Sequence, residues 1–256
     1  MWAKRSYRIS YFLIALSVIL YVYFGFFAKR YHSISIITAY VGLFTSYWYL
    51  YKASELNINT LLLIGILFRL IFLFSMPGLS DDIYRFIWDG KLLHEGIHPF
   101  SHVPSWFIAN NRLPDTLNIE LYNSLNSPNY FTIYPPVGQF LFWVSAFSDS
   151  VLGAAIIMRI FIFVAELGSI YLLLQLSDAY NLSKRNVLIY ALNPLVILEL
   201  TGNLHLESLM IFFLLLGIYS YKQSRYLTAG SALALAIASK LIPLIILPVF
   251  LRRISI

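Results

Sequence analysis

Cysteine is absent from this 256-residue chain, and charge is scarce, since Asp, Glu, Lys and Arg make up 12% of the residues. Without cysteine the protein has no disulfides, no thiolate metal ligands and no cysteine nucleophile. Hydrophobic residues account for 59% of the chain, and the mean hydropathy is +0.74. A soluble protein of this length would carry more charge, so the composition predicts an all-α, polytopic helical membrane protein.

The basic residues lie at the ends of apolar runs and not in one patch, so the net charge of +6 does not indicate a nucleic-acid partner. In a membrane protein their positions set the orientation instead. Lys4, Arg5 and Arg8 precede the first apolar run and predict a cytoplasmic N-terminus. Lys29 and Arg30, after that run, oppose this orientation. No small-residue cleavage pattern follows, so the run is interpreted as an uncleaved helix rather than a signal peptide.

Long apolar runs dominate the remainder of the chain. A spanning helix needs about 20 mostly apolar residues. Several later runs are shorter than this, which predicts broken or re-entrant helices. The runs cover residues 9–27, 34–51, 57–76, 134–147, 151–176, 187–200, 206–221, 227–238 and 241–251. We expect about eight spans in a single transmembrane domain, 1–256, without internal repeats.

A polar segment, 77–133, separates the third run from the fourth and lies outside the cytoplasm in the predicted orientation. Ordered loops of such length are often functional. Residues 81–95 at its start have helical spacing, with apolar side chains on one face and with Asp82, Arg85 and Asp89 turned away. This pattern predicts a helix that lies in the plane of the membrane interface.

Three aspartates within nine positions, Asp81, Asp82 and Asp89, make this helix the leading candidate for an active site. Carboxylates at a membrane surface must be solvated, paired, or placed against a cationic or proton-bearing partner. Asp81 and Asp82 are suited to act as a general base toward a hydroxyl, and the pair is also suited to hold a divalent metal. The simpler alternative is an acidic helix start with Ser80 as the N-cap.

Two further residues are candidates at the start of the fourth apolar run. Tyr134 and Gln139 flank Pro135 and Pro136 and are predicted to be polar groups at the interface. The alternative is an ordinary helix start, because proline is tolerated in the first helical turn.

The remaining candidates are predicted on the same side of the membrane as Asp81. His205 and Glu207 lie between two apolar runs and are suited to bind a metal, position a phosphate or relay a proton, unless they belong to a plain polar turn. Lys240 lies within an apolar stretch. A lipid-linked phosphate is a natural partner for it, and snorkelling to the interface is the alternative.

Charged residues also fall inside the apolar runs. Glu166 is expected to form a structural ion pair with Arg69 or with Arg159, since an intramembrane charge needs a partner. His98 follows the acidic helix and is suited to bind a metal with Asp89, although loop histidines are more often simple hydrogen-bonding groups.

Several motifs together resemble integral-membrane glycosyltransferases of the GT-C superfamily, and most closely bacterial polyprenyl-phosphate-mannose-dependent mannosyltransferases. The specific block is Asp-Asp-Ile-Tyr-Arg-Phe-Ile-Trp-Asp-Gly-Lys at 81–91, followed by Gly-Ile-His-Pro-Phe at 96–100 and Thr-Ile-Tyr-Pro-Pro at 132–136. Asn-Pro-Leu at 193–195 and Lys-Leu-Ile-Pro at 240–243 follow in the same order. One departure is His-Leu-Glu at 205–207. In the related enzymes the polar residue after the histidine is usually aspartate, often in a His-Asn-Asp arrangement.

The resemblance implies transfer of a hexose from a polyprenyl-phosphate donor to a glycolipid or glycan acceptor. The hexose that it implies is mannose. The site would face outward from a bacterial inner membrane, among membrane lipids. Asp81 or Asp82 would be the catalytic base, with Mg²⁺ or Mn²⁺ as an optional cofactor held by the same pair. The implied substrate-binding residues are Arg85, Asp89, His98, Tyr134, Gln139, His205, Glu207 and Lys240.

Two alternatives stay open at this point. A transporter or flippase of lipid-linked sugars would predict inverted repeats, and the sequence contains none. Family members generally continue with more spans, so the chain is expected to be an N-terminal part of a longer enzyme, and an inactive fragment is the second alternative.

Overall fold

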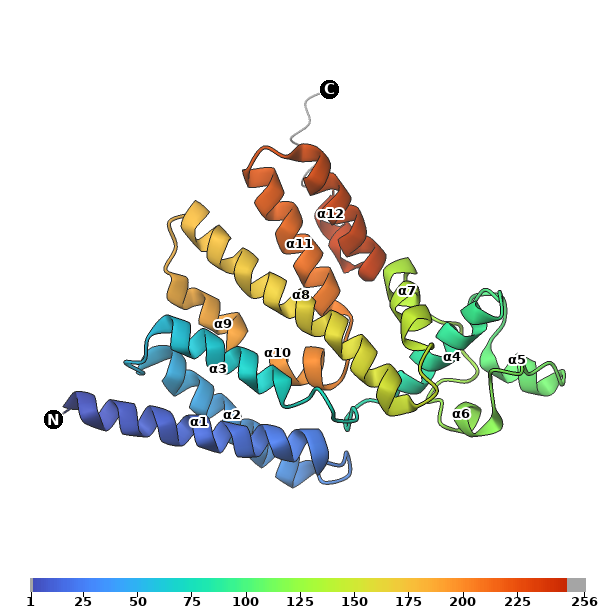
Figure 1. The fold of residues 1–256 in the computed structure, drawn as a ribbon, viewed down its shortest axis with the longest axis horizontal. Helices are drawn as coiled ribbons and strands as arrows, with labels where there is room; N and C mark the ends of the chain where they lie inside the picture. The colour runs from blue at the N-terminus through green and yellow to red at the C-terminus, as the bar shows by residue number, and fades with distance from the viewer. Residues whose placement is uncertain (1, 248–256) are drawn as a thin grey trace. The chain divides into compact units, whose positions relative to one another are not determined.

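The computed structural model describes residues 2–247, and every regular element in that range is helical, without strands (Figure 1). The predicted all-α class is therefore confirmed. The longer helices are α1 (Trp2–Phe26), α2 (Ser33–Lys52), α3 (Ile58–Leu70), α4 (Asp82–His94), α7 (Pro136–Ser145), α8 (Val151–Ala179), α11 (Glu207–Lys222) and α12 (Tyr226–Ser239). The shorter ones are α5 (Pro104–Ala109), α6 (Ile119–Asn123), α9 (Leu188–Ala191) and α10 (Pro194–Val196).

Two of the described helices are long and apolar enough to cross a membrane, α1 and α8. The segments 194–202 and 207–222 meet the same test only when they are taken together across the break between them. The expected total of about eight spans stays a prediction. The last apolar run, 241–251, extends beyond the described residues.

The apolar run 187–200 forms a broken helix. A break was predicted because the run is too short to span a membrane. α9 ends before Asn193, whose side chain accepts a hydrogen bond from the Leu195 N–H at 3.0 Å and so caps α10. Pro194 lacks an N–H and disfavours helical geometry in the residue before it, which explains the interruption. A π-helical segment, Ile197–Gly202, follows directly.

The chain folds into two compact units. Unit 1 comprises Met1–Ser80 and Arg159–His205, and unit 2 comprises Asp81–Met158 and Leu206–Ile256. In unit 1, α1 packs along α2 (Figure 1). A Cβ atom on Gly65 would lie 2.5 Å from the carbonyl oxygen of Ala191, so a glycine lets α3 and α9 approach closely.

The charges buried in unit 1 confirm one of the two predicted ion pairs. The Arg69 Nη2 lies 2.8 Å from the Glu166 Oε2, and both side chains are fully buried. Arg69 also donates to the carbonyls of Gly65 and Ala191, and the Tyr190 hydroxyl donates to Glu166. Because the pair is surrounded by further hydrogen bonds, its charges are compensated in an apolar setting.

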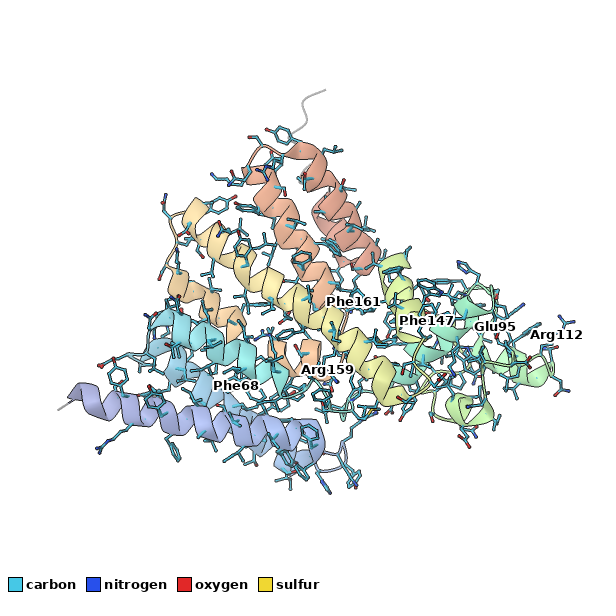
Figure 2. The ribbon with its side chains drawn as sticks, in the orientation of Figure 1. Phe68, Glu95, Arg112, Phe147, Arg159 and Phe161 are labelled. Atoms are coloured by element: carbon cyan, nitrogen blue, oxygen red, sulfur yellow. The ribbon has the colours of Figure 1, made fainter. Side chains whose placement is uncertain are left out.

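Arg159 on α8, which is labelled in Figure 2, instead donates to backbone carbonyls. Its acceptors are the oxygens of Leu73 and Ser75 after α3 and of Thr201 and Gly202 at the end of the π-helical segment. The last carbonyls of a helix lack intrahelical partners. The guanidinium supplies those partners and fixes two chain segments at once.

Unit 2 contains two tightly packed helix pairs, α11 with α12 and α4 with α7 (Figure 1). At the second contact, a Cβ on Gly90 would lie 2.2 Å from the Phe142 carbonyl oxygen. The rings of Phe86 and Phe142 stack there with centroids 4.4 Å apart. This close contact fixes α4, which carries the acidic residues, against α7.

Candidate active site

The acidic motif forms the first turn of α4. The helix begins at Asp82, and its N-cap residue is Asp81, one position after the Ser80 that the simpler alternative supposed. The side chain of Asp81 makes no capping hydrogen bond. Both carboxylates are partly exposed at the end of the helix that favours negative charge. Capping therefore does not account for the side chain of Asp81.

Asp82 is held by two side chains from the segment that precedes α7. The Asn126 Nδ2 donates to the Asp82 Oδ1 at 2.8 Å, and the Tyr134 hydroxyl also forms a hydrogen bond with this carboxylate. Burial raises the pKa of Tyr134, and the negative charges of Asp82, Asp89 and Glu207 raise it further. Tyr134 consequently stays a protonated donor, which orients Asp82.

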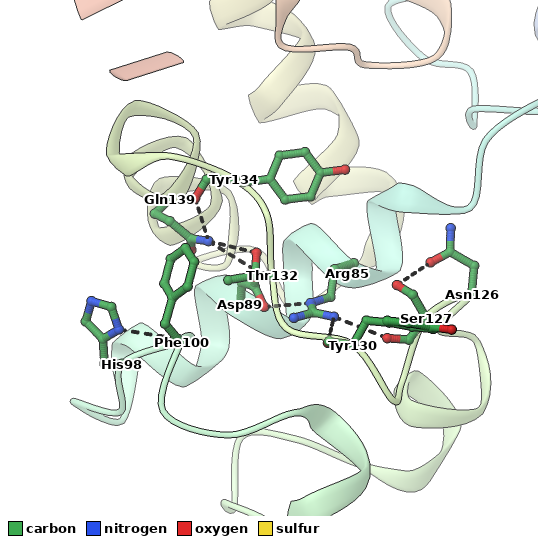
Figure 3. Close-up of polar contacts among 10 residues, drawn as sticks. All are labelled: Arg85, Asp89, His98, Phe100, Asn126, Ser127, Tyr130, Thr132, Tyr134 and Gln139. Atoms are coloured by element: carbon green, nitrogen blue, oxygen red, sulfur yellow. Dashed lines mark hydrogen bonds and ion pairs between the residues drawn. The ribbon is translucent and has the colours of Figure 1, made fainter. Parts of the chain in front are cut away.

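One turn further along α4, Arg85 and Asp89 form a buried ion pair, with the Arg85 Nε 2.9 Å from the Asp89 Oδ1 (Figure 3). Gln139 on α7 donates to the other oxygen of Asp89 at 3.1 Å and to the Thr132 hydroxyl at 3.1 Å. Arg85 is 4% exposed and Asp89 0%. The expectation that both residues turn away toward a polar surface is wrong, because α7 and the segment before it cover that face.

The charge of Asp89 is compensated only in part. Burial raises the pKa of the Asp89 carboxyl, and the guanidinium of Arg85 with the bonds from Thr132 and Gln139 offset part of the rise. A buried carboxylate with this many partners is typical of a positioning element.

Arg85 connects α4 to the loop that holds Asp82. Its Nη1 donates to the carbonyls of Ser127 at 3.3 Å and Tyr130 at 3.0 Å (Figure 3). The same loop carries Asn126 immediately before Ser127. The buried network therefore fixes the loop whose Asn126 orients the Asp82 carboxylate.

Glu207 and Lys240 form an ion pair at the ends of α11 and α12. Glu207 is the first residue of α11, and Lys240 is the C-cap of α12. The charge of Glu207 also acts on Tyr134. Unit 2 thus brings together members of three predicted motifs: Asp82, Tyr134, and the pair Glu207 and Lys240.

The two predicted histidines have other surroundings. The His205 Nδ1 lies 3.5 Å from the Glu199 Oε2 in unit 1. The His98 Nδ1 accepts from the Phe100 N–H at 3.3 Å in an exposed turn (Figure 3). The contacts described for His98 stay within its own turn.

The sequence did not single out Asn126 or Thr132. Asn126 lies in a loop rich in Ser and Asn, where one amide has no distinguishing spacing. Thr132 stands two residues before Tyr134, inside a motif that was recognised, but its hydroxyl gave no separate signal. Their partners on α4 are 44 and 43 positions earlier in the sequence, so only the fold identifies them.

A metal ion at this site would need water or substrate phosphate as ligands in addition to the protein side chains. Within residues 2–247 no group of three or more His, Asp or Glu side chains is arranged to hold an ion. Asp81 and Asp82 supply two neighbouring carboxylates. Mg²⁺ is commonly held by one or two carboxylates together with water and substrate phosphates, so the donor set is compatible with that ion.

Comparison with known proteins gives the following findings. The model of a family described as alpha-(1->6)-mannopyranosyltransferase, N-terminal domain, matches residues 19–254. The alpha-(1->6)-mannopyranosyltransferase A of Corynebacterium glutamicum is 22% identical over 182 residues, which cover 69% of this chain and 35% of that protein. The chain thus spans about a third of the length of this relative. No solved structure matches the chain.

Proposed function

Because the chain belongs to the family of alpha-(1->6)-mannopyranosyltransferase N-terminal domains, we propose that it is the catalytic part of a membrane glycosyltransferase. It moves mannose from a polyprenyl-phosphate donor to a glycolipid or glycan acceptor. The observation that carries the proposal is the Asp82 carboxylate, which Asn126 and Tyr134 hold at the start of α4.

In the proposed reaction a carboxylate of the first turn of α4 takes the proton of an acceptor hydroxyl. The hydroxyl oxygen forms a bond to the anomeric carbon, and the bond from that carbon to the phosphate oxygen breaks. Polyprenyl phosphate leaves with the bonding electrons. Asp82 is the better placed base because two donors orient it, and Asp81 is its neighbour and the alternative.

Lys240 is proposed to stabilise the charge that develops on the leaving phosphate. Its ammonium is paired with Glu207, and the charge of Glu207 acts on Tyr134, which is bonded to Asp82; these contacts support the proposed role. A fixed cation in a site with little water is effective for this role because it needs no reorganisation. Arg85 is committed to Asp89 and two carbonyls, so its role is to hold the loop.

The proposed setting is a bacterial inner membrane, with the site on the outer side and a GT-C arrangement of about eight spans. The apolar helices α1 and α8 are compatible with it. α4 then lies at the interface, where a lipid-linked donor meets a polar acceptor.

A divalent metal is a separate part of the proposal. Mg²⁺ or Mn²⁺ would be held by Asp81 and Asp82 together with water and donor phosphate, where it would neutralise phosphate charge. We expect EDTA to lower transfer in washed membranes and added Mg²⁺ to restore it. Full activity in EDTA would exclude this part and leave the role of the carboxylates intact.

The test of the main proposal is sugar transfer in membranes that contain the chain, supplied with radiolabelled polyprenyl-phosphate mannose. Asp81→Asn and Asp82→Asn are compared singly with Asp178→Asn, a matched control whose carboxylate pairs with Lys184 on an exposed surface. Loss of the base should lower transfer by about 100-fold or more, while the control stays active. Full transfer by both site variants would disprove the assignment. No transfer by the stably inserted wild type would favour the transporter or the inactive fragment.

A further inference from the structure

A cavity of about 320 Å³ lies within unit 2, and Asp82 is not among the residues that line it. Tyr84, Ile87 and Lys91 of α4 form one wall. Glu120 on α6 and Asp149, in the turn before α8, line the other side. The proposed transfer reaction uses none of these residues.

The cavity is on the opposite face of α4 from the acidic site. At 3.6 residues per turn, Tyr84 is about 200° around the helix from Asp82, and Lys91 continues the face of Tyr84. Phe86 and Asp89 lie on the Asp82 side by the same spacing. One helix therefore presents two different polar surfaces.

Three polar groups on the cavity wall have no partner among the contacts described for residues 2–247. They are the hydroxyl of Tyr84 and the carboxylates of Glu120 and Asp149. Lys91, by contrast, donates to the carbonyl of Thr116 at 2.9 Å. Glu120 and Asp149 are exposed and Tyr84 is half-buried, so a hydroxyl and two strong acceptors are accessible to a ligand in the cavity.

The chemistry of the wall favours a neutral ligand with many hydroxyl groups. The two carboxylates outnumber the one ammonium, so a phosphate or another anion would be repelled. A volume of about 320 Å³ is at the lower end of the range for small-molecule sites, which suits one sugar ring. The Tyr84 ring and the buried Ile87 offer an apolar surface to the C–H face of a pyranose, and carboxylates accept pairs of its hydroxyls.

We propose that this cavity is a subsite for one sugar residue of the acceptor glycan, remote from the hydroxyl that reacts. The inference rests on the proposed function. The body of an α-helix, about 10 Å across with its side chains, separates the two surfaces. The sugar bound in the cavity must therefore be a different monosaccharide of the acceptor glycan from the one that reacts. We accordingly expect an oligosaccharide to bind better than a monosaccharide.

The test measures binding of an α-(1→6)-linked mannotetraose to the full chain in lipid nanodiscs by titration calorimetry. Glu120→Gln and Tyr84→Ala alter the cavity, and Glu95→Gln, in the exposed turn after α4, is the matched control. Loss of one charged hydrogen-bond acceptor should weaken binding about tenfold, and the control should bind as the wild type does. Equal affinity of the wild type and both cavity variants, or no binding by the wild type, would overturn the subsite.

Asp82→Asn separates this inference from the proposed function. We expect this variant to bind mannotetraose with unchanged affinity while transfer is lost. In the cavity variants we expect a higher KM for long acceptors at nearly unchanged kcat, because the cavity residues do not touch the reacting atoms. If the wild type binds mannotetraose but transfers no sugar, the proposed transferase function is wrong and the sugar-binding subsite stands. If both cavity variants transfer sugar with an unaltered KM, the subsite is wrong and the transferase function stands.

Discussion

At the residue scale, two side chains from the segment before α7 orient Asp82. Asn126 and Tyr134, both neutral side chains, donate to its carboxylate. Two donors on one carboxylate fix its direction, because each hydrogen bond is lost when the side chain turns away. This arrangement suits a group that must accept a proton during the reaction.

Tyr134→Phe removes one of these donors and keeps the ring that packs edge-on against Phe86 and Phe142. We expect kcat for transfer to fall about tenfold, the value of one hydrogen bond to a charged group. Tyr130→Phe is the matched control, because that side chain is 73% exposed and contributes only its carbonyl to Arg85. Equal kcat in the two variants would show that the phenol does not orient the base.

Asp89→Asn tests the buried network. The substitution leaves the Arg85 charge without its carboxylate, which should lower the free energy of unfolding by about 3–5 kcal/mol. Adding Arg85→Met should recover part of the loss, because no buried charge then remains unpaired. Thermal unfolding in detergent checks both variants, and a double variant no more stable than Asp89→Asn would contradict this account.

At the element scale, the sequence identified most helices from their apolar pattern alone. The runs 9–27, 34–51 and 151–176 correspond to α1, α2 and α8, and the acidic helix was expected at 81–95, close to the bounds of α4. The burial of Arg85 and Asp89 could not be predicted in this way. A helical pattern shows which face is apolar, but it does not show that a second element will cover the polar face.

Gly90→Ala tests the contact of α4 with α7. The added methyl would meet the Phe142 carbonyl at 2.2 Å, and backbone cannot move aside as a flexible side chain can. We expect a loss of about 1–3 kcal/mol in stability, together with reduced transfer, because α4 carries Asp82. Gly230→Ala in α12 is the control, since its methyl would meet no atom within 4 Å. Similar melting temperatures for the two variants would refute the close contact.

At the scale of the whole molecule, the helices alone do not determine which way the protein faces in the membrane. The positions of the basic residues predict that orientation. Lys222 and Arg225 flank the turn between α11 and α12 and predict a cytoplasmic position for it. The segment 77–133 is predicted on the opposite side. The absence of cysteine makes this prediction directly measurable, since a single introduced thiol is the only one present.

Ser101→Cys and Gln223→Cys place that thiol at exposed positions of the two predicted sides. In spheroplasts we expect an impermeant maleimide to label Ser101→Cys at once. Gln223→Cys should react only after the membrane is permeabilised. The reverse pattern would place α4 on the cytoplasmic side and would contradict the proposed donor geometry.

The sequence by itself determined the helical class, the apolar runs, the acidic helix and the motifs around it. These properties follow from composition and from periodicity within one segment. Only the tertiary structure decided which polar groups are partners. Asp82 pairs with Asn126, Gln139 with Asp89, and Glu207 with Lys240. These partners lie 33 to 50 positions apart, and a local pattern carries no information about which distant segment will cover a given face.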